Sequence, residues 1–391
     1  MGRAPTTTLE VSILVNATRL RAPLAALGLG MALLVAACGG SSSGSSSSAT
    51  PAPSASVQTG NPTSAVTLNE SGATLLLPYL QQQVPQVKQT YSNITLAPSG
   101  GGSGKGISDS IAGTVQMGGS DAYLSDAQAK QNPDLLNIPI VVSSQAINYN
   151  LPGVNDLKLT GNVLAQIYSG KINKWNDSQL TKLNPGANLP NQAIVPIRRV
   201  DASGDTFIFT SFLSATNNDW NNGPSMGTTV TWPAVQGELT ASGNPGMVQQ
   251  AKATPGSIAY VGVSAEKTAL DQGLGEAQLQ NKAGQYVKPT QQTAEAAANT
   301  KGTNLPADLR ASLIYQDGAQ SYPIVNYEYL LVKSKQADSN TALALRSYLA
   351  WAIDPSQGMT PQNLAAVNFV ALPGPVQQKV KGQIAKIQSG S

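Results

Sequence analysis

Histidine does not occur in this chain of 391 residues, and cysteine occurs only once. The absence of histidine removes the commonest general base, the Ser-His-Asp triad and every imidazole ligand for a metal ion. A single cysteine excludes an internal disulfide and a metal cluster built on cysteine. We therefore predict a protein that is not an enzyme and that uses no metal ion and no cofactor.

Charged residues are also scarce, since they form only 12% of the chain. The first 37 residues hold three arginines and one glutamate, so the remainder has 21 basic and 20 acidic residues. Binding to nucleic acid requires a clear excess of positive charge on one surface. We expect no nucleic-acid partner.

The beginning of the sequence has the pattern of a lipoprotein signal peptide. Arg19 and Arg21 precede an apolar run, 22–37, that ends directly before Cys38. A basic segment, a short apolar segment and small residues at the cleavage point are typical of export signals, whereas a transmembrane helix needs about 20 apolar residues. We predict a signal peptide over residues 1–37, lipidation of Cys38, and a lipid-anchored protein on the extracellular or periplasmic side of the cell membrane.

Residues 38–65 follow as a serine-rich segment. From residue 39 onward it consists mainly of Ser, with Ala, Pro, Gly and Thr, and it contains no charged residue. Such a composition buries too little apolar surface to offset the entropy lost on ordering. We predict a flexible tether here and a folded region over residues 66–391, a length near that of two domains.

Helix and strand signals alternate through the folded region. Helical spacing of apolar residues begins near Gly72, with Pro85 as its expected end, and Asn137–Tyr149 is predicted to be a pair of strands. Further helices are expected near 107–115, 161–169, 203–213, 338–353 and 375–387, and further strands at 94–96, 193–198, 257–263 and 322–333. This alternation predicts an α/β fold.

Three segments place small or hydroxyl-bearing residues directly before a predicted helix: Ser71–Leu75, Gly100–Gly106 and Ala202–Thr206. Free backbone N–H groups and the positive end of the helix dipole make such a turn suitable for an anion. Each turn alone is equally explained as an ordinary helix cap, because Ser, Asp and Gly are common at that position.

The sequence of the Gly100–Gly106 loop departs from two motifs that it partly resembles. A phosphate-binding P-loop would need glycine in place of Ser99, and serine or threonine in place of Gly106. A nucleophilic serine motif would need glycine in place of Lys105. The loop therefore predicts neither a nucleotide site nor a nucleophile.

Two charged residues near these turns have alternative roles. Asp121 either caps a turn or accepts a hydrogen bond from a ligand. Arg199 either makes a surface ion pair or supplies the full positive charge on a bound oxyanion, with Asp201 holding it in orientation.

Several motifs occur in a fixed order and are together more specific than any one glycine-rich loop. They are Gly72–Leu75, the loop around Ser103, Gly119–Ser125, Tyr168–Trp175, Leu183–Gly186, Arg198–Phe207 and Pro323–Glu328. In these motifs the region 66–391 resembles the phosphate-binding lipoproteins (PstS family) of the bacterial high-affinity phosphate ABC transporter, in the form found in actinobacteria.

The resemblance implies a set of phosphate-binding residues. The implied donors are the hydroxyl and backbone of Thr74, the backbone of Leu75, Ser103, Arg199, Ser203 and the backbone of Gly204, and Asp121 is the implied acceptor. Two positions depart from the common family pattern. Leu75 replaces a phenylalanine of many relatives, and Asp205 replaces a threonine. Asp205 is expected either to accept a second phosphate proton or to cap its helix.

The resemblance also implies a two-lobed periplasmic-binding-protein fold (type II) with a hinge and with the ligand in the cleft between the lobes. We place the chain crossings near Ser143–Tyr149 and Tyr322–Asn326. Residues 66–147 with 323–391 then form lobe 1, and residues 148–322 form lobe 2. The implied partners are inorganic phosphate, the permease subunits of an ABC importer and, through them, its ATPase.

Three alternatives remain open at this stage. The first is a binding protein for another tetrahedral oxyanion, sulfate or molybdate, although a fully deprotonated anion gives the pocket carboxylates no proton to accept. The second is a secreted phosphatase, which the absence of histidine disfavours. The third is a surface adhesin or signalling lipoprotein.

Overall fold

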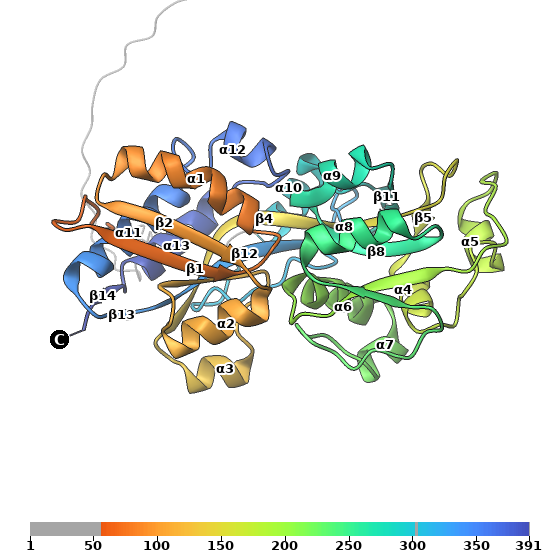
Figure 1. Cartoon of the computed structure of the whole chain (residues 1–391), viewed down its shortest axis with the longest axis horizontal. Helices are drawn as coiled ribbons and strands as arrows, with labels where there is room; N and C mark the ends of the chain where they lie inside the picture. Colours follow the sequence, from red (N-terminus) through yellow and green to blue (C-terminus); the bar gives the residue numbers. More distant parts are fainter. Residues whose placement is uncertain (1–55, 302–303, 391) are drawn as a thin grey trace, which may run out of the picture. The chain divides into compact units, whose positions relative to one another are not determined.

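The computed structural model describes residues 56–301 and 304–390, which belong to one unit of the chain, Pro53–Ser391. The predicted signal peptide and Cys38 lie outside the described residues. None of the described helices combines the length and hydrophobicity needed to cross a membrane. The fold is mixed α/β, as predicted (Figure 1).

One large sheet organises the described residues. Its strands lie in the order β2-β1-β3-β12-β4-β8-β6-β7, and β9 pairs additionally with β4. Their bounds are β1 (Val66–Gly72), β2 (Ile94–Gly100), β3 (Met117–Ser120), β4 (Leu135–Tyr149), β6 (Val195–Arg199), β7 (Leu239–Ala241), β8 (Ser257–Gly262), β9 (Gly275–Glu276) and β12 (Val325–Lys333). We call β2, β1, β3 and β12 with their helices the first half, and β8, β6 and β7 with theirs the second half.

Strand β4 belongs to both halves. Its residues Leu135–Ser144 pair with β12, and its residues Gln145–Tyr149 pair with β8, both antiparallel. The prediction of a strand pair over 137–149 is therefore wrong: the pairing partner changes while the chain continues as a single strand of 15 residues. The change falls within the predicted crossing at 143–149, although the lobe boundaries themselves stay a prediction.

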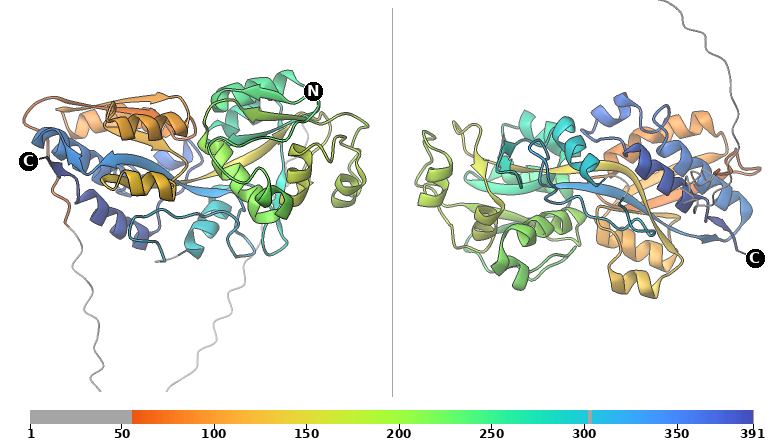
Figure 2. Two further views of the ribbon diagram at one scale, coloured as in Figure 1. Left: turned by 90° about the horizontal axis from the view of Figure 1, so that it is seen from below. Right: turned by 180° about the vertical axis from the view of Figure 1, so that it is seen from behind.

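Parallel strands within each half are connected through helices, because a parallel pair needs a long crossover connection. In the first half α1 (Leu77–Thr90) connects β1 to β2, and α2 (Ser103–Ala112) connects β2 to β3. In the second half α6 (Gly204–Thr216) and α7 (Asn218–Asn222) lie between β6 and β7, and α8 (Gly243–Ala253) lies between β7 and β8. Figure 2 shows these helices on both sides of the strands.

Helices from the end of the chain complete the first half. Helix α11 (Ser339–Ala352) contacts β1, and α13 (Gly374–Ile384) contacts β4, so both ends of the described chain pack on the same part of the sheet (Figure 1). The remaining helices are α3 (Asp126–Gln131), α4 (Gly161–Tyr168), α5 (Ser178–Leu183), α9 (Glu266–Asp271), α10 (Gln291–Thr300) and α12 (Pro361–Ala365). Short strands β5 (Lys158–Leu159), β10 (Gln278–Gln280), β11 (Tyr286–Val287), β13 (Lys335–Gln336) and β14 (Gln388–Ser389) form two small sheets.

Helix α1 differs from its sequence prediction at both ends. It begins at Leu77 rather than Gly72, because Pro78 fits the first helical turn and the preceding residues form a turn. It also passes through Pro85, which was expected to stop it. Pro85 faces solvent, whereas Leu80 and Val87 on the other face are buried in the core, and this burial outweighs the hydrogen bond that proline removes.

Part of the predicted tether contacts the fold. The backbone N–H of Gly60 donates to Ser347 Oγ at 2.9 Å, and the backbone N–H of Thr63 donates to Asn340 Oδ1 at 2.9 Å. Contacts with α11 thus begin several residues before position 66.

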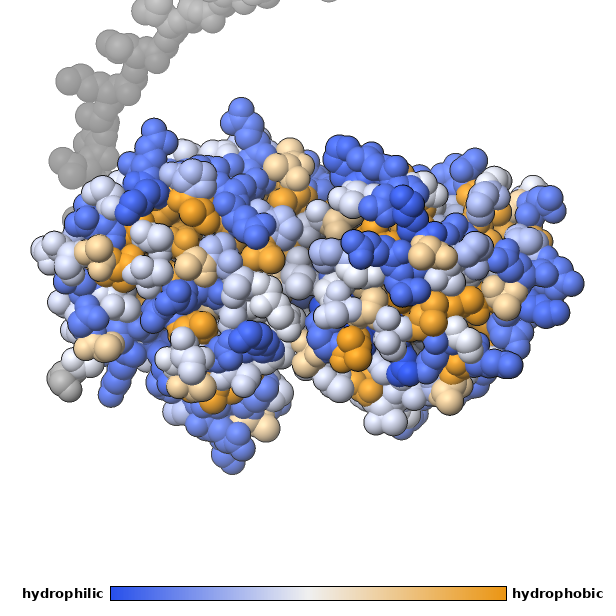
Figure 3. All heavy atoms as spheres, viewed as in Figure 1, coloured by the Kyte–Doolittle hydropathy of each residue, from blue (hydrophilic) through white to orange (hydrophobic). Residues whose placement is uncertain are grey.

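Large apolar side chains are mostly buried in the described residues. The exceptions are Val200, Met226 and Leu270, which expose 68%, 52% and 43% of their surface. On the face in Figure 3, hydrophobic residues occur in small groups between polar ones.

Candidate functional site

Two helix N-termini, one from each half, meet at the centre of the fold. Helix α2 begins at Ser103 after Gly101 and Gly102, whose positive φ angles of 141° and 88° suit glycine. Helix α6 begins at Gly204 after its N-cap Ser203, whose Oγ accepts a hydrogen bond from the Thr206 N–H at 3.3 Å. Both helices thus direct their positive dipole ends into the same space.

The two termini approach each other closely. The Gly104 N–H donates to the Ala202 carbonyl at 2.9 Å, which joins the α2 turn to the α6 turn. A methyl group on Gly204 would lie 2.3 Å from both Asp121 Oδ2 and Ser103 Oγ. Only a residue without a side chain permits this contact between the halves.

Ser103 and Asp121 form the first-half side of the site. The Asp121 N–H donates to Ser103 Oγ at 3.0 Å, and Ser103 Oγ donates to Asp121 Oδ2 at 3.2 Å. Both side chains are buried. Burial and the neighbouring carboxyls of Glu328 and Asp205 raise the pKa of Asp121 well above its usual range.

Arg199 is the positive charge of the second-half side. It is the last residue of β6, and its Nε donates to Asp201 Oδ1 at 2.8 Å while a terminal nitrogen donates to Asp205 Oδ2 at 2.7 Å. Burial lowers the pKa of Arg199, but the two aspartates more than offset this effect and raise it overall. Burial alone would raise the pKa of Asp201. The hydrogen bond and the positive charge of Arg199 outweigh the effect of burial, so the pKa of Asp201 lies below its usual range. Arg199 is therefore a buried cation and not part of a surface pair.

Asp205 lies at the centre of a network of donors. Its carboxyl accepts hydrogen bonds from Asn244 Nδ2 at 2.8 Å, from Gln145 Nε2 at 3.1 Å and from the Arg199 guanidinium. Burial raises the pKa of Asp205 despite these donors. The helix cap is Ser203, so Asp205 acts through these contacts and not as the N-cap.

Thr74 and Leu75 complete the predicted set in the turn between β1 and α1. Thr74 Oγ1 accepts a hydrogen bond from the Asn244 N–H at 3.2 Å, which links the first half to α8. The Leu75 side chain is buried, and a methyl group on Gly262 would lie 2.5 Å from its Cδ1. The structure thus brings the eight predicted residues into one region between the halves.

Sequence reasoning missed Asn244, Gln145 and Glu328. Asn244 contacts both Thr74 and Asp205, and its Oδ1 accepts the Gly262 N–H at 2.8 Å. It follows a serine-glycine turn at the start of α8, so the pattern that identified the other three turns also occurs here. The signals for Gln145 and Glu328 are weaker, since each is a polar residue inside an apolar strand.

A cluster of aromatic rings supports the second-half side from behind. Phe209 and Tyr260 stack with their centroids 4.5 Å apart, and Tyr168 meets Phe209 edge-on at 4.8 Å. The Tyr260 hydroxyl accepts the Arg199 N–H at 2.9 Å and lies 2.8 Å from Thr206 Oγ1. Each aromatic pair adds about 0.5–1.5 kcal/mol beyond its burial, which holds β6 and α6 in fixed register at the site.

The arrangement suits a small oxyanion. Two helix N-termini, several hydroxyls and one buried guanidinium supply donors, and Asp121 supplies an acceptor. Within residues 56–301 and 304–390, no group of three or more Cys, Asp or Glu side chains is arranged to hold a metal ion.

Comparisons with known proteins agree with this geometry. The chain matches the PBP superfamily domain over residues 56–356. It is 33% identical over 331 residues to the phosphate-binding protein PstS of Methanocaldococcus jannaschii, covering 79% of this chain and 83% of that protein. It is 34% identical over 284 residues to PstS of Haemophilus influenzae, covering 72% and 82%. It is also 31% identical over 336 residues to PstS 2 of Mycobacterium tuberculosis, covering 82% and 87%.

Solved structures share the fold at lower identity. A high-affinity periplasmic phosphate-binding protein (PfluDING) with bound phosphate aligns with a TM-score of 0.66 and 23% identity, over 81% of this chain and 93% of that one. A phosphate-binding protein from Stenotrophomonas maltophilia aligns with a TM-score of 0.63 and 21% identity, over 82% and 94%. The periplasmic-binding-protein fold predicted from the sequence is confirmed.

Proposed function

The chain belongs to the PBP superfamily and to the PstS phosphate-binding proteins within it, and from this we propose that it captures inorganic phosphate outside the cytoplasm for an ABC importer. The observation that carries the proposal is the buried Arg199, which is paired with Asp205 in the first turn of α6, where Gly204 approaches Ser103 and Asp121. A buried cation with two helix N-termini beside it favours a small, highly charged oxyanion.

In the proposed complex both halves donate hydrogen bonds to the phosphate. Thr74, the Leu75 backbone and Ser103 donate from the first half, and Arg199 with the Ser203–Gly204 turn donates from the second. Asp121 accepts the proton of a P–OH group. Because the ligand would join the two halves, binding and closure would be coupled.

Asp121 also sets the proposed preference among oxyanions. Phosphate and arsenate carry a proton near neutral pH and can donate it to a carboxylate. Sulfate and molybdate carry no proton near neutral pH, so the negative charge of the same carboxylate would repel them. A binding role for either anion is thus the weaker proposal.

Calorimetry on the chain purified in detergent tests the function. We expect phosphate and arsenate to bind, and sulfate and molybdate to bind at least about a hundredfold more weakly, because a site built to accept a ligand hydroxyl rejects an analogue without it. Tight sulfate binding would overturn the choice of ligand. Turnover of p-nitrophenyl phosphate would instead support the phosphatase alternative.

The proposal includes a membrane anchor and transport partners. Cys38 follows the predicted cleavage point and is the single cysteine of the chain, so it is the single thiol available for a lipid. The tether would let the folded region reach the permease subunits of the importer, whose ATPase works on the other side of the membrane.

Replacing Cys38 by alanine is expected to release the protein from the membrane. Thioether formation needs the thiol, and no second cysteine can substitute. Cell fractionation and labelling with palmitate would follow the change, with a Ser41→Ala variant as the control that keeps its lipid. Palmitate incorporation that persists in Cys38→Ala would contradict the proposal.

A further inference from the structure

Glu328 is a buried carboxyl directly beside the site. Strands β3 and β12 pair antiparallel with Tyr329 opposite Ser120, and Glu328 and Asp121 are the residues that adjoin this last pair on the two segments. Glu328 is fully buried, and Ser143 Oγ donates to its Oε1 at 2.5 Å. The carboxyls of Glu328 and Asp121 are close enough that each shifts the pKa of the other.

One oxygen of each of these two carboxyls lacks a hydrogen-bond donor. Among the described residues, neither Glu328 Oε2 nor Asp121 Oδ1 receives a hydrogen bond from a nitrogen or hydroxyl donor. Two carboxylate oxygens repel each other, so a hydrogen bond between them requires one shared proton. One proton shared between Glu328 and Asp121 would give both of these oxygens a partner.

The charges around the pair explain why the proton is retained. Besides Asp121, the ionisable groups that act on Glu328 include Asp205 on α6, and Asp205 is itself paired with Arg199. Ser143 and Asn326 are its uncharged polar neighbours. Burial raises the pKa of both carboxyls of the pair. Glu328 and Asp205 raise the pKa of Asp121 further, and Asp205 also raises that of Glu328, whereas the interaction with Asp121 lowers the pKa of Glu328. The pair thus keeps its proton at pH values where an exposed carboxyl has lost it.

We propose that Glu328 is a positioning and specificity residue of the phosphate site: it donates the shared proton to Asp121 Oδ1 and so leaves Asp121 Oδ2 as the acceptor for a ligand hydroxyl. This inference rests on the proposed function. A P–OH group that donates to Oδ2 would favour the carboxylate form of Asp121, and the shared proton then lies on Glu328. Without that proton, a phosphate would face one further buried negative charge.

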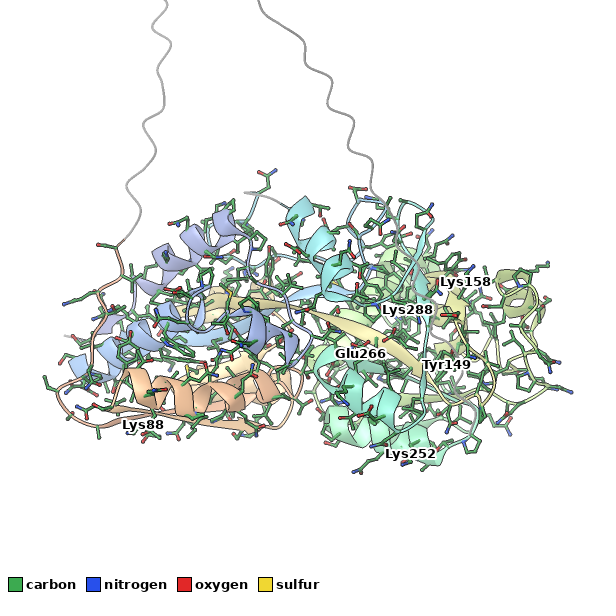
Figure 4. All side chains as sticks on the ribbon, turned by 90° about the horizontal axis from the view of Figure 1, so that it is seen from above. Lys88, Tyr149, Lys158, Lys252, Glu266 and Lys288 are labelled. Carbon is green, nitrogen blue, oxygen red and sulfur yellow. The ribbon has the colours of Figure 1, made fainter. Side chains whose placement is uncertain are left out.

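The test compares two substitutions of Glu328 with a matched control. Glu328→Gln keeps the shape and an N–H donor toward Asp121 but cannot lose a proton at neutral pH. Glu328→Leu keeps the volume and removes the donor. Glu276→Gln is the control, because Glu276 is a buried carboxyl outside the site, partnered with Glu266 of α9. Figure 4 labels Glu266 in the second half.

Phosphate affinity is measured by calorimetry at pH 6, 7.5 and 9. At pH 6 we expect Glu328→Leu to bind about ten to a hundredfold more weakly than the native chain, and Glu328→Gln about threefold more weakly. As the pH rises, the native pair loses its proton and native affinity falls, whereas the amide keeps its donor. The ratio of the Glu328→Gln dissociation constant to the native one should therefore decrease toward pH 9, and the ionisation of phosphate itself cancels in this ratio.

The outcomes separate this inference from the proposed function. If the native chain binds no phosphate, the function is wrong. If the native chain binds phosphate but the ratio stays constant from pH 6 to 9, Glu328 has only a structural role and the inference is overturned. Thermal melting identifies a Glu328→Leu variant that fails to fold, in which case the pH profile of Glu328→Gln against Glu276→Gln decides alone.

Discussion

Arg199→Ala is expected to weaken phosphate binding by about tenfold to a few hundredfold, because a charge-assisted bond to a desolvated anion contributes about 1.5–3 kcal/mol. The geometry adds a second reason for a large effect. Arg199 neutralises Asp201 and Asp205 inside the fold, and its removal leaves both carboxylates facing an incoming anion. Calorimetry with phosphate measures the loss directly.

The same substitution is expected to lower stability. Removing one partner of a buried ion pair typically costs about 3–5 kcal/mol, because the other charge stays buried without compensation. Arg199→Lys is the matched control: it keeps the charge but cannot donate to both aspartates through a planar fork, so its affinity should lie between those of the native chain and Arg199→Ala. If a folded Arg199→Ala variant binds phosphate with native affinity, Arg199 only neutralises Asp201 and Asp205 and does not bind phosphate.

Gly204→Ala is expected to reduce affinity by about tenfold to a hundredfold through steric overlap alone, since overpacking a fitted contact costs about 1–3 kcal/mol. The added methyl group would lie 2.3 Å from Asp121 Oδ2 and from Ser103 Oγ, both in the opposite half. Alanine is a good helix former, so α6 itself should not lose stability. The loss should therefore appear in phosphate calorimetry, and any fall in melting temperature should come from the overlap between the halves and not from α6.

Gly246→Ala is the control for this experiment. Gly246 lies inside α8, and a methyl group there would lie 3.6 Å from the Ala241 side chain, an ordinary contact. Its phosphate affinity should match that of the native chain. If Gly204→Ala binds phosphate equally well, the halves do not need to approach as closely as they do here.

Local patterns were enough to predict the α/β class and most of the helices that shape the site. Apolar spacing located α4, α6, α11 and α13 to within a few residues, because each buries one face in a core. The small-residue turns before α2 and α6 were also visible, since helix caps have local sequence rules. Their meeting point was inferred from family resemblance and not from spacing.

The remaining features depend on contacts that no local pattern encodes. Ser143 and Glu328 are separated by 185 positions and meet only because β12 pairs with β4. Pro85 has a clear local preference to end a helix, but packing of α1 against the core overrides it. The 15-residue strand β4 looked like two strands because periodicity does not show where a pairing partner changes.

Strand order has a consequence for how this chain acquires its structure. β12 lies between β3 and β4 in the sheet, yet it is the last of these strands to be synthesised. A growing chain thus presents β3 and β4 with open edges until nearly all of it has been made, and such edges are prone to pair with other chains. Late pairing of β12 also means that the sheet of the first half cannot be completed until most of the chain is present, and pairing over such a long sequence separation is slow.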